Sequence, residues 1–323
     1  MRKTIKFILS TLILSSSLNL YSQTKDEAGV AYNEGIQFTK SEEYNKAIVS
    51  FEKAIDICTK VGTEADDLKA MAAEQLPSQY YKSATALYQE KKIDEAIKKY
   101  EKTVEIAKKY NNTEIEAKAN DAIPQLYYLK GASSYKKDDF ENALNYLNIS
   151  IQRDPDFAKA YYLIGLVYNK MDDIAKMKES FDIAISKAEA EGDIKTASNS
   201  KKASLKLLTN YAIKAIQSEN ADDAIKYLDQ AGEYGEGDAN TYYYYALAYN
   251  KIKDWDKAII SANKALEIEK DEKDAKAKIY FELGTAYYGK GDTSEACKAY
   301  KDAAYGDYVA QANYQLKEVL KCQ

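Results

Sequence analysis

The chain repeats one arrangement of small and large apolar residues along most of its length. A small residue is followed by an alanine after 12 positions, by an aromatic residue or leucine after 16, and by a second small residue after 19. Met177 and Ala262 depart from this pattern, so the fourth and sixth copies are looser matches. Seven copies in register indicate an internal repeat. Their first small residues, the anchors, are Gly35, Ala84, Gly131, Gly165, Ala212, Ala246 and Gly284.

Acidic residues recur inside these copies, just before the second apolar segment. An aspartate at such a position accepts hydrogen bonds from the free backbone N–H groups of a helix N-terminus and interacts favourably with the helix dipole. Because the acids recur at one place in the pattern, we interpret them as helix caps in a short turn, rather than as a metal or catalytic site. They are Asp138–Asp139, Asp172–Asp173, Asp222–Asp223, Asp254 and Asp292.

The spacing resembles that of the tetratricopeptide repeat, a helix-turn-helix unit of about 34 residues. In that family small residues let the two helices of a unit cross closely, and large residues fill the gap between units. The resemblance covers roughly residues 28 to 305. It implies an all-α, right-handed α-solenoid of about seven units within residues 23–307. We expect residues 308–323 to form a capping helix and tail that cover the last repeat.

The intervals between anchors are uneven. Three intervals measure 34 to 38 residues and three measure 47 to 49. Inserts that begin after Gly62 and after Asn111–Asn112 read as helix starts. We expect the first helices that follow the inserts to be longer by about 20 Å and to protrude as arms. Pro77 and Pro124 should kink or restart those helices.

The N-terminus has the features of a secretory signal peptide. A basic start with Arg2, Lys3 and Lys6 precedes an apolar run from Phe7 to Leu20, and small or polar residues follow. This pattern predicts a signal peptide over residues 1–22. The run is too short to span a bilayer comfortably, and no later segment is long or apolar enough to do so. We therefore expect an exported bacterial protein of the periplasm, cell envelope or exterior, with no transmembrane segment after cleavage.

Composition narrows the possible functions. The chain has no histidine, which removes histidine-dependent catalysis and most transition-metal sites. Its net charge is −5, so nucleic acid is an unfavourable partner. Apart from Arg2, Arg153 is its single arginine. We expect no catalytic residue, no metal site and no cofactor, and hence no enzyme.

Three cysteines are present. Cys297 and Cys322 flank the final predicted hairpin, and an oxidising compartment would permit a disulfide between them. For this the tail must curl back, because Cys322 lies further from the turn than Cys297 does. Two small buried residues are the alternative. We interpret Cys58 as a packing residue.

Tyrosine is abundant, with 30 residues. One set, which includes Tyr242 and Tyr249, lies four residues before or three after an anchor, where the family packs side chains between helices. A second set lies three before or four after, and positions seven apart share a helix face. In proteins that this chain resembles, that face lines a concave groove for peptides. The predicted groove residues are Tyr32, Tyr81, Tyr88, Tyr128, Tyr135, Tyr162, Asn169, Tyr243, Asn250, Phe281 and Tyr288.

These observations predict a non-catalytic envelope scaffold that binds a peptide segment or helix of a partner protein in a tyrosine-lined groove. Two alternatives stay open: a carbohydrate-binding accessory protein, and a purely structural repeat protein that associates with itself. A sugar site would need two or three aromatic residues with convergent carboxylates or amides in one pocket. A homo-oligomer is compatible with all three. Tyrosine could also be abundant through compositional bias alone, since the chain is also rich in lysine, asparagine and isoleucine.

Overall fold

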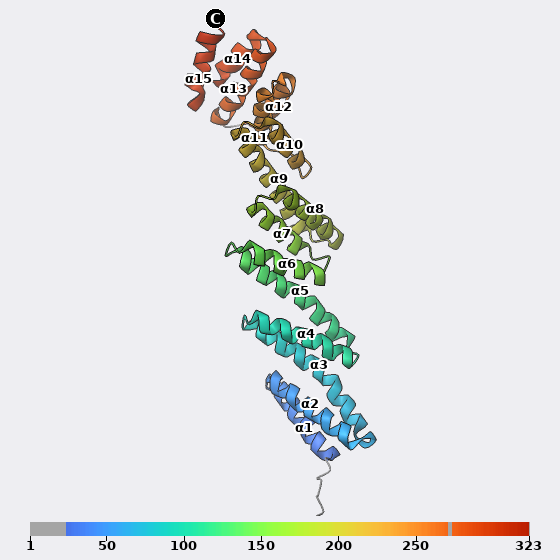
Figure 1. The fold of residues 1–323 in the computed structure, drawn as a ribbon. Coiled ribbons are helices and arrows are strands. Elements are labelled where there is room, and N and C mark those ends of the chain that lie inside the picture. The colour runs from blue at the N-terminus through green and yellow to red at the C-terminus, as the bar shows by residue number, and fades with distance from the viewer. Residues whose placement is uncertain (1–23, 271–272, 323) are drawn as a thin grey trace, which may run out of the picture. The chain divides into compact units, whose positions relative to one another are not determined.

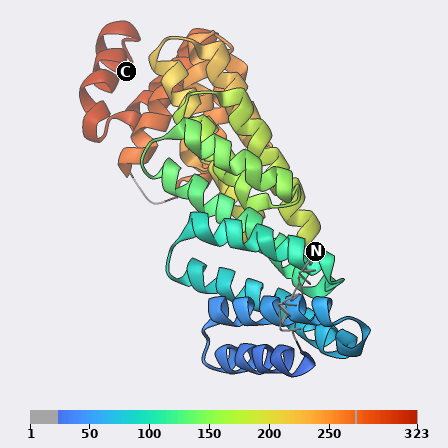
Figure 2. The ribbon, with the colours of Figure 1, turned by 60° about the horizontal axis from the view of Figure 1, so that its bottom comes forward.

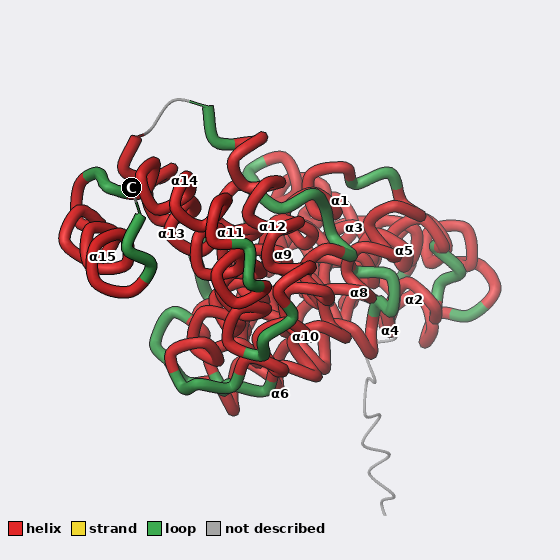
Figure 3. Tube along the Cα trace, turned by 90° about the horizontal axis from the view of Figure 1, so that it is seen from above, coloured by secondary structure: helices red, strands yellow, loops and turns green. Residues whose placement is uncertain are grey.

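The computed structural model describes residues 24–270 and 273–322, and the part of the chain that it describes is α-helical without strands (Figures 1 and 3). It divides into two compact units, Met1–Leu126 and Tyr127–Gln323. The first unit holds α1 (Lys25–Lys40), α2 (Tyr44–Val61), a 3-10 turn (Thr63–Ala65), α3 (Asp66–Gln89), α4 (Ile93–Lys109) and the start of α5 (Thr113–Tyr135). Consecutive helices lie side by side in this unit, as the blue helices of Figure 2 show.

The second unit begins with the end of α5 and continues with helices of the same kind. The prediction of an all-α fold of helix-turn-helix repeats is confirmed. Its elements are α6 (Phe140–Arg153), α7 (Ala158–Lys170), α8 (Ile174–Glu191), α9 (Ile194–Gln217), α10 (Ala221–Gly232), α11 (Ala239–Lys251), α12 (Trp255–Ile268), α13 (Lys273–Lys290), α14 (Thr293–Ala303), a 3-10 turn (Gly306–Tyr308), α15 (Val309–Tyr314) and a π-helical turn (Gln315–Val319).

The anchor glycines let the two helices of a repeat cross closely. A Cβ atom added to Gly165 would lie 2.8 Å from Cε1 of Phe181, the large residue sixteen positions later. The same conflict would arise between Gly35 and Phe51 at 2.7 Å. Only a hydrogen atom fits beneath each ring, which explains why the repeat pairs a small residue with a large one. Two further pairs behave alike, namely Gly131 with Leu147 and Gly284 with Tyr300.

The acidic turn residues cap the second helices. The carboxylate of Asp173 accepts a hydrogen bond from the backbone N–H of Lys176 at 3.1 Å, and Asp139, Asp254 and Asp292 act alike. The interpretation of Asp222–Asp223 as a capping pair is wrong. Both lie inside the first turn of α10, and the Asn220 side chain caps that helix instead.

The helices after the long intervals are lengthened, as expected. α3, α5 and α9 contain 24, 23 and 24 residues, whereas α7 and α11 contain 13 each. Of the two expected effects of proline, a kink or a restart, the restart does not occur, because α3 continues through Pro77 and α5 through Pro124. A proline removes one backbone hydrogen bond. Tight packing offsets this loss in α3, since Pro77 and Leu76 are both buried.

Two of the lengthened helices, α3 and α9, do not protrude as arms, which corrects another expectation. The preceding helices are long too: α2 and α8 each contain 18 residues. Ala65, the last residue of the 3-10 turn before α3, packs with Ile57 and Cys58 of α2. Ala197 of α9 packs with Ala188 of α8. The starts of the α3 and α9 segments therefore lie against the extended ends of α2 and α8.

The C-terminal segment folds back on the last repeat. Lys321 adopts a left-handed φ of 53°, and the N–H of Cys322 donates to the carbonyl of Leu316 at 2.8 Å, which reverses the chain. This reversal brings Cys322 to Cys297 of α14, and the two form a disulfide with Cα atoms 5.9 Å apart. Cys58 is a free, buried cysteine.

Candidate functional site

In the first unit, the predicted groove tyrosines rest against aromatic residues of the second helices. The Tyr81 ring centroid lies 5.5 Å from that of Tyr100 in an edge contact, and Tyr32 lies 5.7 Å from Phe51. Both tyrosines are half-buried. Tyr88, one turn further along α3, is 43% exposed. These rings contribute to packing while one edge faces solvent.

In the second unit, Tyr128 and Tyr135 of α5 and Tyr162 of α7 form one group, which we call the A-face cluster. Their rings are half-buried against Phe157, Phe140 and Phe181, with centroid separations of 5.4, 6.3 and 5.8 Å, respectively.

Burial raises the pKa of all three hydroxyls of the A-face cluster. The charge of Tyr162 contributes to the raised pKa of Tyr128, and that of Tyr135 to the raised pKa of Tyr162. None of them forms a hydrogen bond within the described residues. The cluster is therefore a set of fixed rings whose polar ends are unpartnered.

Asn169 lies at the end of α7, half-buried. Its backbone carbonyl accepts a hydrogen bond from the hydroxyl of Tyr211 at 3.2 Å. Tyr288 of α13 is 47% exposed. These two predicted groove residues lie at helix ends and do not extend the A-face cluster.

Three predicted groove residues do not line an open surface. Tyr243 and Asn250 of α11 are buried, at 9% and 8% exposure, because α13 packs against α11. Phe281 of α13 is covered by Tyr308, whose ring centroid lies 5.4 Å away, and Tyr308 also faces the hydroxyl of Tyr243. The C-terminal segment occupies this face, which the repeat pattern alone does not reveal.

A buried carboxylate lies beneath this covered face. Glu282 is 7% exposed, and the Asn250 side-chain amide donates to its Oε2 at 2.8 Å and to its backbone carbonyl at 2.9 Å. Burial raises the pKa of Glu282, although the Asn250 hydrogen bond and the charge of Lys251 oppose the change. The Asn250 Oδ1 atom has no hydrogen-bond partner.

Substituting Glu282→Gln should stabilise the protein at neutral pH and reduce its pH dependence. Because the pKa of this carboxyl is raised in the folded state, its contribution to the free energy of unfolding is fully present at low pH. That contribution is lost as the pH rises through the folded-state pKa. A glutamine keeps the acceptor, carries no charge and offers an N–H to Asn250 Oδ1. We expect Tm to rise by a few degrees at pH 7, with little change at pH 4, in thermal unfolding followed by circular dichroism. The exposed Glu34→Gln is the control, and an equal response of both variants would contradict this assignment.

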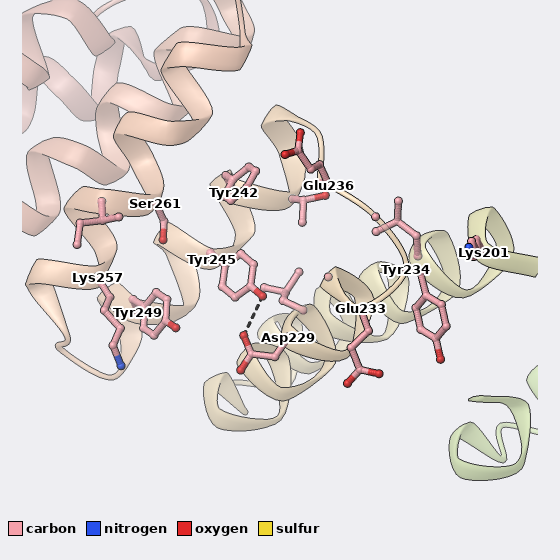
Figure 4. Close-up of a pocket in the computed structure, with 17 residues that line it drawn as sticks. Lys201, Asp229, Glu233, Tyr234, Glu236, Tyr242, Tyr245, Tyr249, Lys257 and Ser261 are labelled. Atoms are coloured by element: carbon pink, nitrogen blue, oxygen red, sulfur yellow. Dashed lines mark hydrogen bonds between the residues drawn. The ribbon is translucent and has the colours of Figure 1, made fainter. Parts of the chain in front are cut away.

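A second surface, which we call the tyrosine pocket, was missed by sequence reasoning. It is a hollow of about 740 Å³ bounded by α10, the 233–237 loop, α11 and α12 (Figure 4). Tyr242, Tyr245 and Tyr249 stand along α11, with successive ring centroids 6.2 and 6.0 Å apart. The Tyr245 hydroxyl donates to Asp229 at 2.8 Å.

The repeat pattern assigned Tyr242 and Tyr249 to packing between helices. Tyr242 does pack against the core cluster of α11 to α13, and both tyrosines also line the tyrosine pocket. The short α10 ends at Gly232 and a loop precedes α11, which leaves the rings half-buried. The sequence carried one signal for this site. Residues 232–237 contain three glycines, and four consecutive tyrosines at 242–245 follow.

Among the described residues there is neither a metal-binding cluster nor a membrane-spanning helix. No cluster of acidic residues and cysteines there has the arrangement of a metal site. In that same part of the chain, no helix combines the length and the apolar character that crossing a bilayer requires.

Two segments match family models of the tetratricopeptide repeat, residues 158–186 and 237–304. The first segment covers α7 and most of α8, and the second covers α11 to α14. Each contains a glycine anchor, Gly165 or Gly284, at which two helices cross closely. The chain contains tetratricopeptide repeats.

Other tetratricopeptide-repeat proteins of known structure are similar to it at low identity. The TPR2AB domain of yeast Sti1, in complex with pHSP90, is 17% identical, with a TM-score of 0.32, over 92% of this chain and 98% of that one. YrrB, described as having an unusual peptide-binding site, is 20% identical, with a TM-score of 0.37, over 65% and 94%. A repeat protein from Parabacteroides merdae is 16% identical, with a TM-score of 0.29, over 92% and 99%. No curated protein matches the sequence significantly.

Proposed function

We propose that this tetratricopeptide-repeat protein is a non-catalytic scaffold that binds a peptide segment or helix of a partner protein at the A-face cluster. One observation carries the proposal. Tyr128, Tyr135 and Tyr162 present hydroxyls that form no hydrogen bond among the described residues, on rings that packing against phenylalanines already holds in place. A tyrosine fixed in this way loses little side-chain entropy on binding and supplies both apolar area and a hydrogen bond.

The proposal includes an envelope location. The basic and apolar pattern of residues 1–22 supports export, and these residues lie outside the described part of the chain. The partner would then be another protein of the periplasm or cell envelope.

Replacing Tyr128, Tyr135 and Tyr162 together by phenylalanine tests the cluster without removing its rings. Each lost hydroxyl should weaken binding by about 1 kcal/mol, so the triple variant should bind its partner about 100-fold more weakly. Partners are captured by cross-linking in native envelope preparations, identified by mass spectrometry and then titrated against both proteins.

The matched control replaces Tyr127, Tyr161 and Tyr168 by phenylalanine, because these residues lie on the same two helices outside the cluster. Capture by the control should equal that of the wild type. If both triple variants bind the identified partner as the wild type does, the A-face cluster is not the binding surface.

A further inference from the structure

The tyrosine pocket has a charge imbalance that points to its occupant. Five charged residues line it, and three of them are paired with residues of opposite charge. Lys257 lies 3.1 Å from Asp254, Lys201 lies 2.6 Å from Glu189, and Glu233 lies 2.9 Å from Lys178. The other two are Asp229 and Glu236, which form no ion pair within the described residues. The uncompensated charge of the pocket is therefore negative.

The rings of this region already attract cations. The ammonium of Lys257 lies 5.2 Å from the Tyr249 ring centroid, and that of Lys178 lies 5.3 Å from the Tyr234 ring centroid. Burial is the main cause of the raised pKa of Tyr249, and the negative charge of Asp229 is the second. The same carboxylate raises the pKa of Tyr245. Aromatic faces beside an unpaired carboxylate favour a cationic group, and guanidinium most of all.

Exposed apolar side chains flank this charged centre. Ile260 at the edge of the tyrosine pocket is 68% exposed. A second hollow, of about 480 Å³, shares Lys201, Leu205 and Tyr234 with the pocket and contains Ile194, which is 81% exposed. Covering a large apolar side chain contributes about 1.5–3 kcal/mol. A protein segment with apolar residues gains from this, whereas a hydroxyl-covered sugar gains much less.

We propose that the tyrosine pocket and its adjoining hollow bind a protein segment in which apolar residues flank an arginine or lysine. The basic group enters beside the rings of Tyr242 and Tyr245 and the carboxylates of Asp229 and Glu236, and the apolar residues pack on Ile260 and Ile194. This interaction surface is separate from the A-face cluster and does not depend on the function proposed for it.

The test uses the purified protein and a fluorescent library of nine-residue peptides with a central arginine and random alanine, valine, leucine or isoleucine at the other positions. A second library replaces the arginine by citrulline, which has nearly the same shape and no charge. We expect the arginine library to bind with a Kd at least tenfold lower than that of the citrulline library in fluorescence polarisation. Equal binding of both libraries would overturn the proposal.

Two double variants of equal charge change localise the binding. Asp229→Asn with Glu236→Gln should weaken binding of the arginine library at least tenfold. Glu219→Gln with Asp222→Asn removes two exposed acids of the α10 region outside the pocket and should leave it unchanged. Equal effects of the two double variants would refute the assignment. So would saturable binding of malto- or cello-oligosaccharides, if the Asp229 and Glu236 changes abolish it.

The two proposals can fail independently. The Tyr128, Tyr135 and Tyr162 phenylalanine variant should bind the arginine library as the wild type does. If it does not, the peptides bind at the A-face cluster and the tyrosine pocket is not their site.

Discussion

Replacing Gly165 by alanine is expected to lower the free energy of unfolding by about 1–3 kcal/mol, the usual cost of forcing an extra atom into a packed core. The new Cβ would lie 2.8 Å from Cε1 and 2.9 Å from Cδ1 of Phe181, a ring that is fully buried and cannot move aside without displacing its own neighbours. Urea unfolding followed by far-ultraviolet circular dichroism measures the change.

Gly29→Ala is the matched control, because it makes the same substitution inside a helix where nothing lies within 4 Å of the added atom. Alanine favours helix over glycine, so this variant should gain about 0.5–1 kcal/mol. The two substitutions should therefore have opposite signs. If both Gly165→Ala and Gly29→Ala stabilised the protein, the helices of the fourth repeat would separate at little cost in free energy. That result would contradict the close packing of Gly165 on Phe181.

Removing the disulfide between Cys297 and Cys322 should destabilise the C-terminal repeat by about 3–4 kcal/mol. The bond closes a loop with a sequence separation of 25 residues, and opening it restores conformational entropy to the unfolded chain. The double substitution Cys297→Ala and Cys322→Ala should lower the urea midpoint. It should also speed amide hydrogen exchange in residues 305–322, as Tyr308 loses its fixed place over Phe281.

A reductant provides the control for the disulfide. It should reproduce the effect of the double substitution in the wild type and cause no further change in the double variant, since Cys58 is not bridged. If hydrogen exchange of residues 305–322 is the same with and without the bond, then packing alone holds the C-terminal segment.

The repeat could be predicted because its determinants are local. Gly165 and Phe181 meet within one hairpin, and the aspartate that caps α8 stands in the turn between them. Such pairs leave a fixed spacing in the sequence. The exception at Asp222–Asp223 is small and has a clear reason, because asparagine at position 220 caps as well as aspartate does.

The candidate sites were harder to predict because they depend on contacts between repeats. The register placed Tyr162 and Tyr243 on equivalent helix faces, yet one belongs to the A-face cluster and the other is buried. The difference comes from α13, which packs against Tyr243, and from Tyr308 of the C-terminal segment, which faces its hydroxyl. The register places α13 and the segment along the chain but does not show which side chains they cover. The tyrosine pocket could not be predicted for a similar reason, because it depends on where α10 ends and how the 233–237 loop is placed.

The lengthened helix pairs suggest how repeats of this kind change size. The end of α2 packs through Ile57 and Cys58 on Ala65 before α3, and α8 packs on α9 through Ala188 and Ala197, in both cases away from the glycine-to-ring crossing. Whole turns inserted or deleted together in both helices of such a pair would widen or narrow one edge of the protein while every anchor contact is kept. These edges are thus natural positions for grafting new surface, in evolution or in design, without redesigning a core.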